Sequence, residues 1–251
     1  MNTTITAAVF VPFFGTTLGA ALALLFKKRF PDRLNRVCGG FAAGVMTAAS
    51  VWSLLLPALE QAGSGGFISA LAGFLAGGLG MIATEKAAAA LMKKRDRDGT
   101  LSSAVFLILA VTLHNVPEGL AVGVACAGFA TGDGTLTAAG LTALSLGIAL
   151  QNIPEGAIIS LPLLARGTGR LKAVGCGVAS GAVEPVAALV ALAAASPVRR
   201  LMPFFLSAAA GAMLYVTAQE LLPEASAPPS RDGSLSFLAG FAPMMTMDVL
   251  L

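Results

Sequence analysis

The chain has 251 residues, of which 56% are hydrophobic and 12% are charged, and its mean hydropathy is +0.83. Soluble domains are about one quarter charged, so this composition excludes an ordinary soluble protein or a disordered chain and predicts a protein embedded in lipid. The net charge of +3 is small and lies mainly in loops, so no nucleic-acid partner is expected. The three cysteines have no CxxC spacing, and we interpret them as small hydrophobic residues without a disulfide framework.

A bilayer core needs about 20 apolar residues per helix, and this length divides the chain into eight apolar segments. The first segment lacks a basic stretch before it and a cleavage site after it, so we expect a span and not a signal peptide. We therefore predict an all-α integral membrane protein with one transmembrane domain over residues 1–251. The predicted spans are 5–26, 37–59, 67–92, 101–129, 136–165, 171–195, 201–222 and 235–251.

Lysine and arginine residues collect in every second connection. Clusters follow spans 1, 3 and 5, and Arg231 follows span 7, whereas the remaining connections carry only Arg199 and Arg200. The positive-inside rule then makes the connections after odd-numbered spans cytoplasmic and places both termini outside the cytoplasm. We expect a multi-pass protein of the inner (plasma) membrane.

Spans 2 and 7 share a sequence pattern. Residues 42–46 read Ala-Ala-Gly-Val-Met and 55–57 read Leu-Leu-Pro, while 209–213 read Ala-Ala-Gly-Ala-Met and 221–223 read Leu-Leu-Pro. The two spans are an odd number of crossings apart and run in opposite directions. The pattern indicates an inverted repeat, spans 1–3 against spans 6–8 around central spans 4 and 5, although Ala/Gly-rich helices can also resemble each other by chance. The small residues of spans 2, 3 and 7 would also allow a homodimer interface.

Spans 4 and 5 carry the same polar motif near their centres. Residues 114–119 read His-Asn-Val-Pro-Glu-Gly and residues 151–156 read Gln-Asn-Ile-Pro-Glu-Gly. In each motif the first residue and the Glu are four apart and lie on one helix face. Each Pro removes a backbone hydrogen bond, which kinks the helix and frees a carbonyl. Free carbonyls beside carboxylates predict a cation site at the membrane midplane.

Glu184 of span 6 is a third carboxylate near the middle of the membrane. A carboxylate at this depth costs at least ~2.5 kcal/mol unless it is paired, neutral or bound to a cation. No Lys or Arg lies deep enough to pair with these carboxylates, so a metal ion or protons must compensate them. Imidazole with carboxylates suits Zn²⁺, Fe²⁺ and Mn²⁺ better than Mg²⁺ or Ca²⁺. The candidate metal ligands are His114, Asn115, Glu118, Gln151, Asn152, Glu155 and Glu184.

Other interpretations of these residues stay open. His114 could be a helix-bridging hydrogen-bond donor, and Asn115 and Asn152 could also hold helices together. Glu184, which precedes Pro185, could cap a broken helix. A different class of function, an intramembrane metal-dependent hydrolase, would require a site such as HExxH. A chain with one histidine cannot form that site, so we expect no enzyme.

These residues together resemble the ZIP (ZRT/IRT-like protein) family of divalent metal transporters, in particular its prokaryotic GufA-like branch. The resemblance covers essentially the whole chain, through both central motifs, 180–185 in span 6, 220–224 in span 7 and 240–249 in span 8. It implies uptake of divalent metal ions into the cytoplasm, with Zn²⁺ as the main substrate and Fe²⁺, Mn²⁺ or Cd²⁺ as further ones.

The resemblance also implies a midplane site for two metals. His114, Glu118, Gln151 and Glu155 would surround one ion. Asn115, Asn152 and Glu184 would hold the second, with Glu118 and Glu155 bridging the two. Many relatives have His where this chain has Gln151 and Gln219, so we expect weaker Zn²⁺ binding and broader selectivity. Near the predicted membrane surfaces, Glu60 and Glu224 are either solvated or positioned to attract cations.

Overall fold

The computed structural model describes residues 2–25, 31–95, 103–132, 136–165, 167–195, 201–226 and 231–250. Every regular element within these ranges is helical, and none is a strand. Seven helical segments in the described part are long and apolar enough to cross a membrane. With the 29-residue helix α4 (Ser103–Thr131), these segments make eight. The prediction of an all-α integral membrane protein is confirmed.

The second and third spans are separated by a kink in the chain. The first span is α1 (Thr3–Leu25), and the second combines α2 (Asp32–Ala49), the π-helical segment η1 (Ser50–Leu55) and the start of α3 (Leu56–Arg95). The expected break before the third span is this kink at Gly63, where two helical segments of α3 meet and the φ of 58° favours glycine. Gly66–Leu91 then forms the third span.

The central pair consists of α4 and α5 (Ala138–Ala165), and both helices continue past their internal prolines. The sixth span is interrupted near its middle, where α6 (Arg170–Gly181) ends and α7 (Val183–Ala195) begins. Glu184 therefore lies in the first turn of a new helix, two residues after the interruption begins.

The last two spans complete the bundle. The seventh comprises α8 (Met202–Val216), the π-helical segment η3 (Thr217–Leu221) and α9 (Leu222–Ala225). The eighth is α10 (Asp232–Leu250), which begins slightly before its predicted start. Both π-helical segments begin four residues after the Met of the shared Ala-Ala-Gly-x-Met pattern and end one residue before Leu-Pro, so the sequence pattern corresponds to a structural one.

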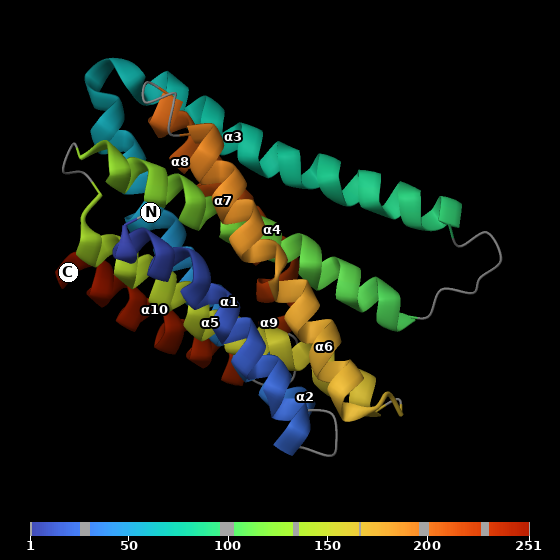
Figure 1. Cartoon of the computed structure of the whole chain (residues 1–251). Helices are drawn as coiled ribbons and strands as arrows, with labels where there is room; N and C mark the ends of the chain where they lie inside the picture. Colours follow the sequence, from blue (N-terminus) through green and yellow to red (C-terminus); the bar gives the residue numbers. More distant parts are fainter. Residues whose placement is uncertain are drawn as a thin grey trace.

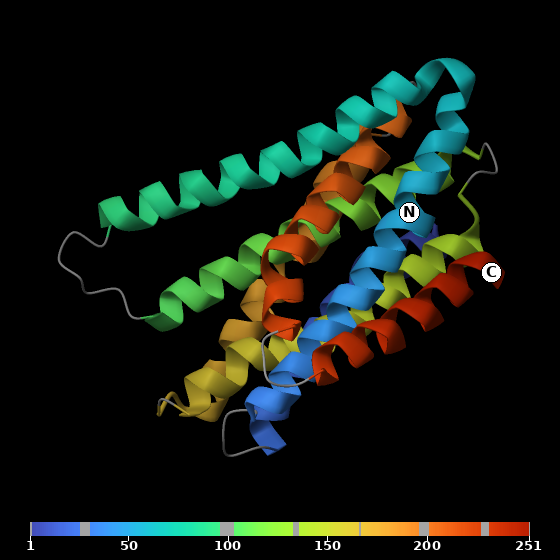
Figure 2. The same cartoon turned by 180° about the vertical axis from the view of Figure 1, so that it is seen from behind.

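The helix packing follows the inverted repeat. The most extensive helix pairs are α1 with α5, α4 with α7, α2 with α10 and α3 with α8. Exchanging span 1 with 6, 2 with 7, 3 with 8 and 4 with 5 converts the first pair into the second and the third into the fourth. Figures 1 and 2 show the two termini at the same end of the bundle, with α1 antiparallel to α6 and α7.

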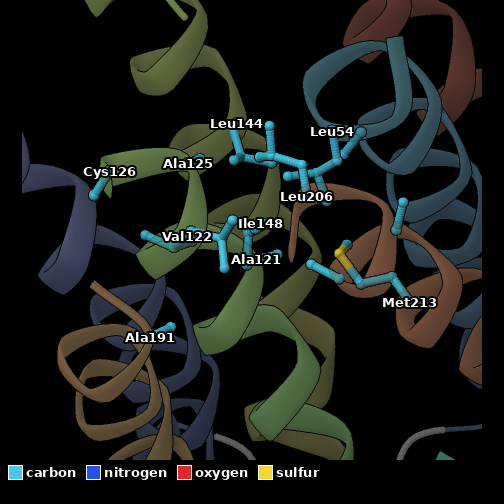
Figure 3. Packing of buried hydrophobic residues seen from close by; sticks show 14 of the residues in the cluster. Leu54, Ala121, Val122, Ala125, Cys126, Leu144, Ile148, Ala191, Leu206 and Met213 are labelled. Carbon is cyan, nitrogen blue, oxygen red and sulfur yellow. The ribbon is translucent and has the colours of Figure 1, made fainter. Parts of the chain in front are cut away.

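The main hydrophobic core lies between the central motifs and the end of the bundle that holds the termini. Figure 3 shows Ala121, Val122 and Ala125 of α4 facing Leu144 and Ile148 of α5 within this core. Beyond it, a cavity of about 280 Å³ opens near the termini and is lined by polar and apolar side chains, among them Trp52, Ser53, Glu60, Thr137 and Asp248. The core therefore separates this cavity from the polar motifs.

Candidate metal site

Glycines bring the backbones of four helices together at the polar motifs. A Cβ atom on Gly119 of α4 would collide with the carbonyl oxygen of Glu184 in α7. A Cβ atom on Gly156 of α5 would collide in the same way with the carbonyl oxygen of Thr16 in α1. Glycine is the residue that permits such backbone approach. The two contacts place α7 beside the first motif and α1 beside the second.

The described candidate ligands are withdrawn from the surface. Their exposed fractions are 0% for Asn115, Glu118, Gln151 and Asn152, 1% for Glu184 and 7% for Glu155. The side chain of His114 lies outside the side chains that the structure describes, so its predicted role stays a prediction. Among the described side chains, no group of three or more His, Cys, Asp or Glu residues could hold a metal ion. Amide oxygens or His114 would have to complete a coordination shell.

Hydrogen bonds connect the motifs to each other and to their neighbours. The Gln151 amide of α5 donates to Oε1 of Glu118 in α4 over 2.7 Å. Asn152 donates to Oε2 of Glu184 over 2.8 Å, and the Thr16 hydroxyl donates to Oε1 of the same carboxylate over 2.6 Å. Both oxygens of Glu184 are thus engaged by side chains of α5 and α1, which is not the arrangement of a helix cap.

The two asparagines do bridge helices, as one interpretation of the sequence predicted. Nδ2 of Asn115 donates to the carbonyl oxygen of Ser180 in α6 over 3.3 Å. Nδ2 of Asn152 also lies 3.5 Å from the carbonyl oxygen of Pro12 in α1. These contacts use only the amide nitrogens, so the amide oxygens remain for another partner.

Several buried oxygens at this place receive no hydrogen bond. They are Oδ1 of Asn115, Oε2 of Glu118, Oε1 of Gln151 and Oδ1 of Asn152. Most buried polar atoms in folded proteins have a partner. In addition, Glu184 lies close enough to Glu118 and to Glu155 for the carboxylates to repel each other. Electron-rich oxygens together with repelling carboxylates form an environment that a cation would stabilise.

One residue of the cluster was missed from the sequence. Thr16 is fully buried and contacts Glu184, but it lies in span 1, which has no charged residue and contains other threonines as well. One threonine among several in such a helix carries no signal, because Ser and Thr in membrane helices commonly bond to their own backbone. Only the repeat relationship between spans 1 and 6 could have pointed to it.

Comparison with known proteins agrees with this arrangement. The family model described as ZIP zinc transporter matches residues 98–248, more than half of the chain. The zinc transporter ZIP11 of Xenopus tropicalis is 36% identical, with 93% of each chain covered. The zinc transporter ZIPB of Bordetella bronchiseptica is 37% identical over 95% of this chain and 78% of its own length.

A bacterial relative covers the chain equally well. The zinc transporter GufA of Myxococcus xanthus is 34% identical, over 94% of this chain and 95% of its own length. The eight spans of the described residues, the doubled motif and these relatives lead to one assignment. The chain belongs to the ZIP family of transporters.

Proposed function

We propose that this protein carries Zn²⁺, and also Fe²⁺, Mn²⁺ or Cd²⁺, across the inner (plasma) membrane into the cytoplasm. The observation that carries the proposal is the set of buried oxygens without hydrogen-bond donors on Asn115, Glu118, Gln151 and Asn152. Membership in a transporter family and the names of the relatives, all zinc transporters, support Zn²⁺ as the substrate.

One or two ions would bind at the midplane. The first would lie among His114, Glu118, Gln151 and Glu155, and the direct contact between Gln151 and Glu118 supports this grouping. One divalent ion would leave one of the three negative charges uncompensated, and two ions would leave a single positive charge in excess. Either state costs less than three carboxylates without a cation.

The second ion would lie among Asn115, Asn152 and Glu184, with Glu118 and Glu155 shared. The hydrogen bond between Asn152 and Glu184 supports this second grouping. In the absence of a cation, the amide N–H groups of Gln151 and Asn152 partly compensate the carboxylates. On binding, the ion would replace that compensation and engage the amide oxygens.

The membrane orientation follows from charge and is part of the proposal. Basic connections after odd-numbered spans place that end in the cytoplasm and both termini outside it. An even number of spans agrees with the two termini lying at the same end of the bundle (Figure 1). The lipid bilayer is then the main partner of the outer helix faces, and the small-residue faces of the spans would support a homodimer.

An intramembrane metal-dependent hydrolase is not supported. The relatives are named transporters and not enzymes, and a single histidine cannot supply an HExxH-type site.

Radiolabelled Zn²⁺ uptake into proteoliposomes tests the proposal. The double variant Glu118→Ala/Glu155→Ala should lose uptake to the level of empty liposomes, because the site would lose both bridging carboxylates. Glu85→Ala is the matched control. Glu85 is also membrane-embedded and hydrogen-bonded, but to Tyr215 of α8, so uptake should persist. Normal uptake by the double variant would contradict the proposed site.

A further inference from the structure

Two hydrogen bonds align span 1 with span 6, residue by residue. Asn115 of the first motif donates to the carbonyl oxygen of Ser180, and Asn152 of the second donates to the carbonyl oxygen of Pro12. Asn115 and Asn152 are equivalent positions of the doubled motif, 37 residues apart. Pro12 and Ser180, which accept their hydrogen bonds, are therefore equivalent positions of the two repeats, 168 residues apart.

The glycine contacts give the same alignment independently. Gly119 and Gly156 are equivalent motif positions, and their backbones meet the carbonyl oxygens of Glu184 and Thr16 respectively. Thr16 and Glu184 are again 168 residues apart. The hydrogen bonds pair Pro12 with Ser180, and the glycine contacts pair Thr16 with Glu184, one helical turn further along. Both observations therefore give the same alignment of the two repeats.

We infer that Thr16 is the inverted-repeat counterpart of Glu184 and is a positioning residue for the transported cation. Its hydroxyl donates to Oε1 of Glu184 over 2.6 Å, while Asn152 donates to Oε2. With Oε1 held by α1, the carboxylate cannot rotate freely. The other oxygen, Oε2 of Glu184, which accepts from Asn152, would then stay oriented toward the proposed second ion. This inference rests on the proposed function.

The surroundings of Thr16 fix its hydroxyl in place. The residue is 0% exposed, and Gly156 and Gly181 press against its backbone and its side chain respectively. A hydrogen bond to an ionised carboxylate is short and about twice as strong as a neutral one. The 2.6 Å distance agrees with that class of bond. Partners that orient a metal-binding carboxylate typically contribute about 10–100-fold to metal affinity.

The full chain, purified and reconstituted, allows a direct test with Zn²⁺ as the probe. Thr16→Val keeps the shape and removes the donor, so we expect about 10–100-fold weaker Zn²⁺ binding by equilibrium dialysis and a raised KM for uptake. Thr16→Ser keeps the donor and should stay within about threefold of the unmodified protein. If the valine variant does not fold, Thr16→Ala removes the same hydroxyl without requiring more space.

A double-mutant cycle with Glu184→Gln separates positioning from packing. If Thr16 acts through Glu184, then Thr16→Val should weaken Zn²⁺ binding little in the Glu184→Gln background. Two effects that simply add would overturn the inference. So would a Thr16→Val protein that melts at a lower temperature but binds Zn²⁺ like the unmodified chain, because that result describes packing alone.

Different experimental results would contradict the proposed function and the inference about Thr16. Uptake that survives Glu118→Ala/Glu155→Ala contradicts the function itself. Uptake that is lost in that variant, together with unchanged Zn²⁺ affinity in Thr16→Val and Thr16→Ala, overturns only the role of Thr16.

Discussion

Asn152 donates its amide hydrogen to Glu184, yet its own amide oxygen is buried without a donor. In the metal-free protein, the amide nitrogen stabilises the buried carboxylate of Glu184. The oxygen serves no contact in the described structure, and a cation would give it one. Asn152 thus stabilises the metal-free site through its nitrogen and would bind the cation through its oxygen. A substitution should therefore change the stability of the metal-free protein and the stabilisation by the cation in opposite directions.

The substitution Asn152→Asp tests this double role. It removes a donor from Glu184 and adds a second carboxylate beside it, and breaking a buried charged contact costs about 3–5 kcal/mol. We expect a lower melting temperature in EDTA and a larger Zn²⁺-induced rise than in the unmodified protein, measured by thermal unfolding in detergent. Asn2→Asp, at the exposed residue that precedes α1, is the control. A loss of stability that Zn²⁺ does not reverse would argue against an ion at this place.

Gln151 offers only an amide to the proposed first ion, and Gln151→His should supply a nitrogen ligand there. Because imidazole binds Zn²⁺ better than an amide oxygen does, we expect the KM for Zn²⁺ uptake to fall about tenfold, or ~1.4 kcal/mol. Competition by Mn²⁺ should weaken. Gln219→His is the matched control, since Gln219 is exposed in η3 and lies apart from the cluster. Equal gains in both variants would mean that the effect is not local to the site.

Gly156→Ala should destabilise the protein, because the new methyl group would meet the carbonyl oxygen of Thr16. Overpacking of this kind typically costs about 1–3 kcal/mol. Gly175→Ala in α6 meets nothing within 4 Å and should be neutral or stabilising by about 0.5–1 kcal/mol. Thermal unfolding of both variants checks the difference, and similar melting temperatures would show that α1 and α5 can separate without cost.

The cavity near the termini should attract cations before they reach the midplane. Glu60 and Asp248 both line it, and Ser53 holds one oxygen of Asp248 at 2.7 Å. Glu60→Gln/Asp248→Asn should raise the KM for Zn²⁺ severalfold at low ionic strength and leave the maximal rate unchanged. Salt screens exposed charges over about 8–10 Å at physiological strength, so the difference should shrink as salt rises. A KM increase that persists at high salt would instead indicate direct coordination.

Hydropathy predicted the all-α membrane class correctly, because lipid imposes length and apolarity on every span. The Gly/Ser-rich stretch between the second and third apolar segments predicted a break, and the structure has a kink there, at Gly63, where the backbone leaves helical geometry. The π-helical segments, in contrast, escaped prediction, since their hydrogen-bond pattern leaves no mark on residue periodicity.

The contacts within the site depend on tertiary structure. Helical spacing places Gln151 on the same face as Glu155, but its observed hydrogen bond reaches Glu118 on the neighbouring helix. Sequence spacing within one helix cannot identify such a partner, because the rotation and offset of α4 against α5 decide it. Thr16 escaped for the same reason, as its role exists only where α1 meets α7.

The pairing of a hydroxyl with a carboxylate at equivalent repeat positions has an energetic consequence. In an inverted repeat, exchanging the conformations of the two halves converts a pathway open to one side of the membrane into one open to the other. Identical halves would give both arrangements the same free energy. Thr16 and Glu184 differ at equivalent repeat positions, so we expect exchange of the two half-conformations to connect states of unequal free energy in the empty protein.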